Sequence, residues 1–257
     1  MNTIAHHPLA PDQAALWWLG QAGYLLRAGD ITLAIDPYLT DSVGVAAPDF
    51  TRLYPPPLAP EDLRVDLYLV THDHGDHLDP ETVRRYPAQS KTWFVAPRLA
   101  ARRLAELGVP TDRIRRLDSG ESLTLEGVEL RGVFALPTGS DVLDTTGFWI
   151  RLPNGRTVYH TSDTAFHPLV LAAAPREPDV MLVPINGKWG NPSPAEAVTF
   201  VETVRPRFAF PNHYDLMALN AENPEVFRWF CQQRGLGANC VIPRVLEPFV
   251  WNGHAMP

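Results

Sequence analysis

The sequence has little of what several classes of protein require. Its two cysteines, Cys231 and Cys240, are too few for a disulfide framework. The first ten residues have neither the basic start nor the apolar stretch of a secretory signal. No apolar run approaches the roughly 20 residues that a membrane-spanning helix needs. We therefore expect a cytoplasmic protein without a membrane partner.

Net positive charge is also lacking, since the formal net charge at pH 7 is −7. Non-specific binding to nucleic acid needs a basic surface, so a nucleic-acid partner is not expected. A small anionic substrate stays compatible with this charge, because a bound divalent cation dominates the field around it. The partner that we expect is a small-molecule substrate, and a homo-oligomer is left open.

The sequence does contain enough apolar material for a sizeable core. Hydrophobic residues make up 45% and charged residues 20% of the 257 residues, so a disordered chain is not expected. No low-complexity linker divides the sequence. We therefore expect a single domain over residues 1–257.

Short strands bounded by turn residues outnumber helices, and the two halves of the chain are arranged alike. Asp79 and Ser193 precede prolines and are expected to cap helices. The pattern favours an α/β fold in which two sheets pack face to face with helices outside. One expected helix begins at residue 80, and the others span 97–107, 168–174, 194–204 and 224–233. The expected strands are 14–20, 24–28, 31–36, 65–70, 92–95, 122–125, 128–135, 147–152, 157–160, 180–184, 208–210 and 246–251.

The most informative segment is residues 71–78, which read Thr-His-Asp-His-Gly-Asp-His-Leu. They follow an apolar run, so these polar side chains lie at the end of a buried strand, where α/β proteins place their sites. A solvated polar turn is the plainer alternative. A buried cluster would be costly without a cation, and its imidazole and carboxylate groups suit zinc, with manganese or iron also compatible. The potential ligands are His72, Asp73, His74, Asp76 and His77.

Such a cluster cannot enclose a metal alone, so further ligands should follow later strands. Asp163 and His213 both do so. Taken singly, Asp163 could be a turn residue and His213 a buried structural histidine. Their shared position after strands favours the interpretation that both are metal ligands.

Together these residues resemble the metallo-β-lactamase-fold hydrolases. The resemblance covers roughly residues 14 to 251, and further segments are similar to the L-ascorbate-6-phosphate lactonase branch of that superfamily. The segments that carry the second resemblance are 18–23, 35–39, 52–57, 77–82, 184–187, 211–215 and 223–224.

The resemblance implies a four-layer αββα sandwich that holds one or two divalent metal ions. It assigns His72 and His74 to a first metal position, and Asp163 to a bridge between two positions. Asp36 would accept a proton from a ligand imidazole and fix its tautomer. The second metal position would be formed by Asp76, His77 and His213.

The sequence departs from this family pattern in the loop 136–144, which lacks the histidine usually supplied to the first position. Asp141, Asp144 or Ser140 could substitute, and so could His167. A single metal, or two held with unequal affinity, would follow from this loss. His160 is expected to be buried, either as a structural residue or in support of the ligands.

The expected reaction is hydrolysis by a metal-bound hydroxide that opens a lactone or similar ester, a phosphorylated sugar lactone included. Asp76 would hold or accept the proton of the attacking water while it ligates the metal. No G-x-S-x-G nucleophile motif is present. A phosphodiesterase of the same fold and a catalytically decayed binding protein are the alternatives.

The substrate pocket is the least constrained part of the sequence. Basic or amide side chains could bind a phosphate, and aromatic side chains could form walls. Trp189 and Asn220 are further wall candidates, although the 188–189 pair could equally be a loop whose indole covers the core. The residues that we expect at the pocket are Tyr38, Arg52, Asn186, Lys188 and Tyr214.

Overall fold

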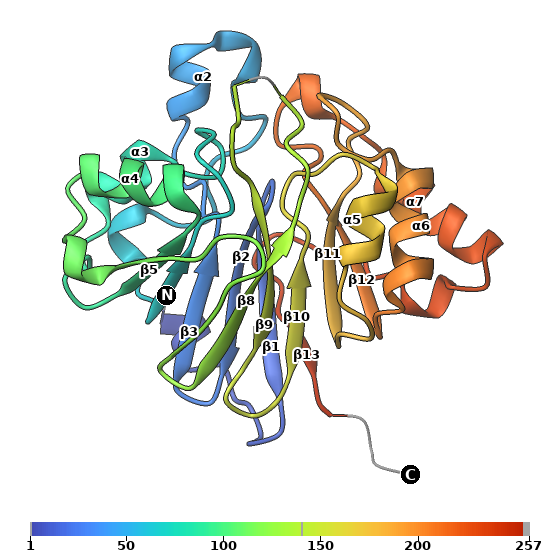
Figure 1. Cartoon of the computed structure of the whole chain (residues 1–257), viewed down its shortest axis with the longest axis horizontal. Helices are drawn as coiled ribbons and strands as arrows, with labels where there is room; N and C mark the ends of the chain where they lie inside the picture. The colour runs from blue at the N-terminus through green and yellow to red at the C-terminus, as the bar shows by residue number, and fades with distance from the viewer. Residues whose placement is uncertain (1, 140, 254–257) are drawn as a thin grey trace.

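The computed structural model describes residues 2–139 and 141–253, and it contains two mixed sheets packed face to face. Figure 1 shows helices α3 (Pro80–Arg85) and α4 (Arg98–Glu106) outside one sheet, and α5 (Pro168–Ala173), α6 (Pro194–Val204) and α7 (Pro224–Gln233) outside the other. The predicted layered αββα sandwich is therefore confirmed.

The first sheet has the strand order β13-β1-β2-β3-β4-β5-β6. Strands β1 to β3 form antiparallel hairpins, whereas β3 to β6 run parallel. The bounds are β1 Ala14–Gly20, β2 Gly23–Ala28, β3 Ile31–Ile35, β4 Leu67–Leu69, β5 Trp93–Ala96, β6 Ile114–Arg116 and β13 Phe249–Trp251.

The second sheet has the order β12-β11-β10-β9-β8-β7, with β10, β11 and β12 parallel. Its strands are β7 Ser122–Leu125, β8 Val128–Phe134, β9 Thr146–Arg151, β10 Thr157–His160, β11 Val180–Pro184 and β12 Phe208–Asn212. Strands in the middle of the sandwich are buried on both faces, which explains their nearly continuous apolar sequences.

Polar side chains cap the N-termini of two outer helices, as expected. The Asp79 side chain accepts a hydrogen bond from the backbone amide of Glu81 at the start of α3. Ser193 and Glu196 form a capping box at the start of α6. None of the helices within residues 2–139 and 141–253 has the length and apolar character that a membrane span requires.

Apolar side chains fill two layers of the sandwich. Leu26, Leu69, Phe148 and Leu182 belong to the core cluster between the sheets. A second cluster, which includes Phe94, lies between the first sheet and helices α3 and α4. With both layers packed, the strand ends are fixed relative to one another, and so are the loops that follow them.

The main differences from the sequence-based expectations are β6 and α2 (Ser42–Ala46), neither of which was expected. β6 is an edge strand of three residues, two of them arginine, so it shows no apolar alternation. α2 is short, contains Gly44 and has no side-chain cap. The remaining short elements are α1 (Asn2–Ala5), η1 (Pro48–Phe50), η2 (Pro60–Asp62), η3 (Thr111–Arg113), η4 (Ala218–Asn220) and η5 (Gly237–Asn239).

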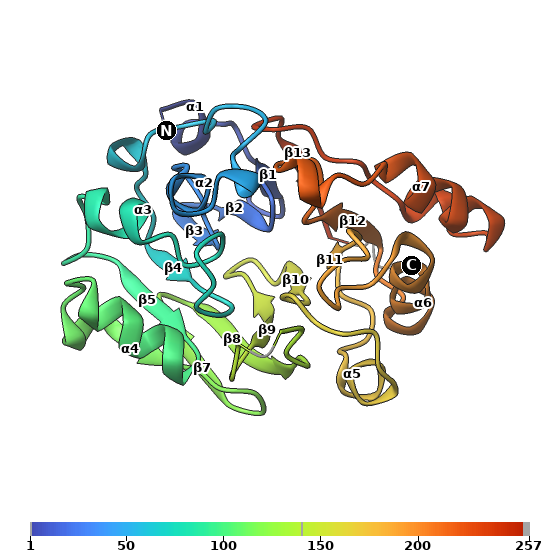
Figure 2. The same cartoon turned by 90° about the horizontal axis from the view of Figure 1, so that it is seen from above.

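The loops that leave the two sheets meet at one end of the sandwich. Figure 2, seen from above, shows the loops after β4, β10 and β12 approaching each other between the two halves of the molecule. This end is where the sequence places its polar clusters.

Candidate metal centre

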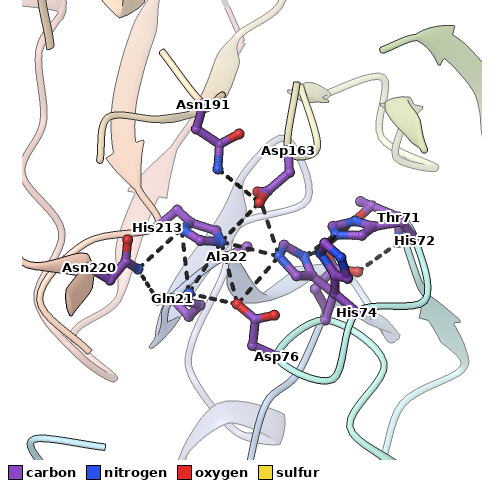
Figure 3. A network of polar contacts seen from close by, with 12 residues as sticks. Gln21, Ala22, Thr71, His72, His74, Asp76, Asp163, Asn191, His213 and Asn220 are labelled. Carbon is purple, nitrogen blue, oxygen red and sulfur yellow. Dashed lines mark hydrogen bonds and ion pairs between the residues drawn. The ribbon is translucent and has the colours of Figure 1, made fainter. Parts of the chain in front are cut away.

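The loop after β4 and the loop after β12 bring their histidines into direct contact. The Nε2 atoms of His77 and His213 lie 3.3 Å apart, although the two residues are 136 positions apart in the sequence. Asp163, which follows β10, lies between them, with one carboxylate oxygen 3.1 Å from Nε2 of His213. Figure 3 shows the side chains of Asp163, His213 and Asp76 pointing toward a common centre. Three segments of the chain therefore converge as the sequence predicts.

Two groups of side chains within the described residues could each hold a metal ion. One consists of Asp76, His77 and His213, with one ligand atom from each lying within 4.8 Å of the others. This set is the predicted second metal position. The other group consists of His72, His77 and Asp163. Asp163 therefore lies beside both groups.

The donor set fits a divalent cation. It consists of buried imidazole nitrogens and carboxylate oxygens, which suit zinc and several other ions. Asn220 supplies a second observation, since its buried Oδ1 has no hydrogen-bond partner among the described residues. The amide nitrogen of Asn220 lies 3.1 Å from Nδ1 of His213 and donates to Oε1 of Gln21 at 2.9 Å. Oδ1 is therefore left without a partner beside the cavity that Asn220 lines.

The predicted first metal position is less complete. Nε2 of His72 lies 3.1 Å from Nδ1 of His74, and Nε2 of His74 lies 3.1 Å from a carboxylate oxygen of Asp141. His74 belongs to neither group of converging ligand atoms, and the same is true of Asp73. This half of the site therefore ends in a histidine–carboxylate contact that is open to solvent.

Of the residues considered as substitutes for the absent histidine, the structure brings Asp141 to the cluster. Asp144 instead accepts a hydrogen bond from the backbone amide of Leu99 at the start of α4. His167 caps α5 by accepting a bond from Leu169. Ser140 lies outside the described residues.

Asp36 forms a hydrogen bond with Nδ1 of His77, the ring nitrogen opposite the one that approaches His213. It is fully buried and accepts hydrogen bonds from Nδ1 of His77 at 2.8 Å, from the Thr71 amide at 2.8 Å and from the Thr71 hydroxyl at 2.6 Å. This contact places the proton on Nδ1 and turns Nε2 toward the site. The geometry is the one that the resemblance implies for Asp36.

His160 does not face the ligands. Its Nε2 lies 3.1 Å from the carbonyl oxygen of Ala22, and its Nδ1 accepts a bond from the amide of Ser162. Burial lowers the pKa of His160, so the ring is neutral at pH 7. It links β10 to the turn after β1 and supports the segment that carries Asp163.

Two of the three amide side chains at the site, Gln21 and Asn191, were not named as candidates by sequence reasoning, whereas Asn220 was named only as a wall residue. Gln21 donates to Asp76 at 2.8 Å, Asn191 donates to Asp163 at 2.8 Å, and Asn220 donates to Gln21 at 2.9 Å. Figure 3 shows Gln21 between His213 and Asp76. Gln21 and Asn191 therefore orient the carboxylates of Asp76 and Asp163, and Asn220 orients Gln21.

A usable signal existed for Gln21. It lies between Gly20 and Gly23 in the turn after an apolar strand, within a segment that contributed to the family resemblance. A polar side chain in a turn at a strand end is a candidate functional residue.

The buried charges at the centre stabilise each other. Burial acts to lower the pKa of His77 and His213, but the nearby carboxylates outweigh it, so the pKa of His77 is well above its usual value and that of His213 is about 9. Burial acts to raise the pKa of Asp76 and Asp163, yet the same two histidines hold both well below the usual value. Burial, followed by the charge of His77, keeps the pKa of His72 low.

Metal binding is therefore expected to release protons and to become tighter as the pH rises toward about 9, the pKa of His213. The reason is that a ligating imidazole must give up the proton that it holds in the metal-free protein. Calorimetric titration with zinc, in buffers of different ionisation enthalpy, measures the number of protons released. A heat of binding that does not depend on the buffer would contradict this assignment.

A cavity of about 400 Å³ opens beside the ligands. Asp76, Asp163 and His213 line it. Its apolar lining, called the apolar wall below, is formed by Val43, Ala47, Phe50, Trp189 and Met217. Trp189 and Asn220, two of the expected wall residues, do line the cavity.

The other expected pocket residues lie elsewhere. Tyr38 and Arg52 are buried beneath the apolar wall and do not line the cavity. Nη1 of Arg52 donates to the carbonyl oxygen of Tyr38 at 2.8 Å, and the guanidinium lies 5.0 Å from the centre of the Tyr38 ring. Arg52 therefore links its own segment to that of Tyr38 and does not face the cavity.

Asn186, Lys188 and Tyr214 are also absent from the cavity lining. The ammonium group of Lys188 donates to the carbonyl oxygen of Ala221 at 3.1 Å. Tyr214 stacks on Trp18 with ring centres 5.1 Å apart. Asn186 is buried, and neither atom of its amide has a hydrogen-bond partner among the described residues.

Comparison with known proteins agrees with the fold. A curated protein of Archaeoglobus fulgidus, described as a UPF0173 metal-dependent hydrolase, is 32% identical over 248 residues, which cover 91% of this chain and 98% of the relative. Among solved structures, Igni18, a metallo hydrolase from Ignicoccus hospitalis, matches with a TM-score of 0.74 at 21% identity over 94% of this chain and 99% of the other.

Another similar structure is an isothiocyanate hydrolase from Delia radicum gut bacteria, with a TM-score of 0.75 at 18% identity over 93% of this chain and 99% of the other. At these identities the structural matches show the fold alone. Residues 32–214 match the family described as the Beta-lactamase superfamily domain. The chain therefore belongs to the β-lactamase superfamily and, within it, to the UPF0173 family of proteins named as metal-dependent hydrolases.

Proposed function

We propose that the protein is a metal-dependent hydrolase that opens a lactone or similar ester. The observation that carries this proposal is the cluster of Asp76, His77, Asp163 and His213 beside a cavity that is otherwise lined largely by apolar side chains. A divalent cation held there would lower the pKa of a water molecule and polarise a carbonyl group.

The chain's own residues would then position the reacting groups. Gln21 and Asn191 fix the carboxylates of Asp76 and Asp163 by donating to them. Asp76 is partly exposed to the cavity, with 18% of its side chain accessible, so it can accept a hydrogen bond from the attacking water and orient it. The solvent-facing Asp141 lies at the other side of the cluster and is also part of the cavity lining.

The form of the substrate follows from the charges around the cavity. No lysine or arginine lines it within the described part of the chain, and both Arg52 and Lys188 are engaged elsewhere. A phosphorylated sugar lactone is therefore a poorer candidate than an uncharged one. The same reasoning disfavours a phosphate diester.

Turnover by the metal-loaded protein tests this proposal. We expect hydrolysis of uncharged γ- and δ-lactones that is lost with a chelator and restored by a divalent metal. We also expect little or no activity on a sugar-phosphate lactone or on bis(p-nitrophenyl) phosphate. Hydrolysis of the diester alone would replace the proposal with a phosphodiesterase, and a protein that neither holds metal nor turns over any of these substrates would contradict it.

A further inference from the structure

The apolar wall has no role in metal binding, yet it forms much of the cavity. It consists of Val43, Ala47, Phe50, Trp189 and Met217. Figure 1 shows α2, which carries Val43, standing above the ends of the strands. The wall therefore lines the same cavity as Asp76, Asp163 and His213, which would hold the metal.

The wall is held in place by its own contacts. Arg52 and Met217 form an isolated antiparallel bridge, and the amide of Leu53 donates to the carbonyl oxygen of Leu216 at 2.7 Å. These bonds join the segment after α2 to the segment that follows His213. A wall fixed in this way is already shaped before a ligand arrives, which reduces the entropy lost on binding.

Trp189 is the most unusual member of the wall. Its side chain is 48% exposed, and its backbone φ of +50° lies in a region that residues other than glycine rarely adopt. Its ring lies 5.7 Å from that of Phe50, centre to centre. A large apolar side chain that is both exposed and held in a strained backbone points to a functional role.

We propose that the apolar wall binds an uncharged alkyl or aryl side group of the substrate, while the scissile carbonyl faces Asp76, Asp163 and His213. This inference rests on the proposed function for the position of the carbonyl group. Burying the side group removes apolar surface of both ligand and wall from water, which stabilises the complex. The substrate class is therefore a neutral lactone or ester that carries an apolar substituent.

The size of the effect follows from the apolar area that is buried. Each methylene group of the substrate that contacts the apolar wall is expected to lower KM by about four-fold, and an aryl group by about ten-fold or more. Hydrophobic pockets discriminate between substrates that differ by such groups by factors of this order. The aromatic faces of Phe50 and Trp189 suit an aryl group in particular.

A matched series of γ-lactones tests the proposal, with hydrogen, butyl, phenylethyl or carboxyethyl as the side group. We expect KM to fall from hydrogen to butyl to phenylethyl and to be highest for carboxyethyl. Trp189→Gly accepts the positive φ, so it should fold, which a thermal melt checks. It is expected to remove most of the preference for phenylethyl by raising KM for that lactone far more than KM for the unsubstituted one.

Two further variants separate the role of the ring from general damage. Trp189→Phe keeps an aromatic face and should retain most of the preference. Trp229→Phe changes a similarly exposed tryptophan on α7, 52% accessible and absent from the cavity lining, and should behave as the wild type. A preference for phenylethyl that survives unchanged in Trp189→Gly would overturn the proposal, and so would equal KM values across the lactone series.

Binding of the corresponding γ-lactams keeps this inference separate from the proposed function, because lactams resist hydrolysis. Tighter binding of the phenylethyl lactam, weakened in Trp189→Gly, would support the apolar wall even if no lactone is turned over. Turnover without side-group preference in either series would leave the hydrolase assignment standing and remove this inference. Absence of both turnover and lactam binding would contradict both.

Discussion

Asp163→Ala is expected to lower kcat/KM for the lactone substrate by more than about 100-fold, the upper range for residues that only support metal ligands. It should also reduce the metal bound per chain. Asp163 belongs to one group of ligand atoms and lies 3.1 Å from His213 in the other. No neighbouring carboxylate can take its place, since Asp76 already contributes to the second group. Metal analysis of the dialysed variant and steady-state kinetics measure the two effects.

A buried aspartate at the opposite end of the same sheet provides the matched control. Asp179 is 7% exposed and accepts a hydrogen bond from the amide of Thr157 at the start of β10. Asp179→Asn should lower the melting temperature and leave the metal content unchanged. Full retention of metal in Asp163→Ala would remove Asp163 from the ligand set.

Asp36→Asn is expected to have the second largest effect, because it breaks a fully buried ion pair. In the metal-free protein at pH 7, His77 is protonated and donates to Asp36 at 2.8 Å. The amide keeps the shape of the side chain and tolerates the φ of +43° at this position. Loss of the pair should lower the free energy of unfolding by about 3–5 kcal/mol. Metal affinity should fall by about 10–100-fold, because the ring of His77 is no longer oriented.

Urea denaturation of the metal-free protein measures the first effect, and titration with zinc measures the second. Asp66→Asn is the control, since Asp66 lies at the other end of β3 and β4 and accepts a hydrogen bond from the backbone amide of Thr32. It should cost about 1 kcal/mol and leave metal affinity unchanged. If Asp36→Asn bound zinc as tightly as the wild type, the role given to Asp36 would be wrong.

The sequence predicted where these histidines and aspartates gather because its signals are local, and their role as metal ligands stays a prediction. His72, His74, Asp76 and His77 lie within one short segment after an apolar strand. A buried parallel strand has a fixed direction, so residues just after it must lie at one end of the sheet. The same reasoning placed His213 at that end, and the structure brings it to 3.3 Å from His77.

The cavity was predicted poorly because its lining depends on loop packing. Tyr38 and Arg52 were expected to face a substrate, but they pack on each other beneath the apolar wall. Residue type alone cannot tell a buried arginine that bonds carbonyl oxygens from one that faces a ligand. Phe50 and Met217 come together only because the segments after α2 and β12 pair.

Gln21 and Asn191 were not named as candidates, and Asn220 was named only as a wall residue, for a related reason. Gln21, Asn191 and Asn220 reach the site from three separate loops, and none lies in a polar cluster of the sequence. Asp141 was named among several substitutes for the absent histidine. Only the path of the loop distinguished it from Asp144, which bonds the start of α4 instead.

Anomalous diffraction from crystals of the metal-loaded protein tests the central claim most directly. Data collected on both sides of the zinc absorption edge would give the number and position of the ions. We predict an ion enclosed by Asp76, His77 and His213 with Asp163 beside it, and weaker occupancy next to His72 and His74. An ion bound elsewhere, or these side chains left without any ion at saturating metal, would contradict the account.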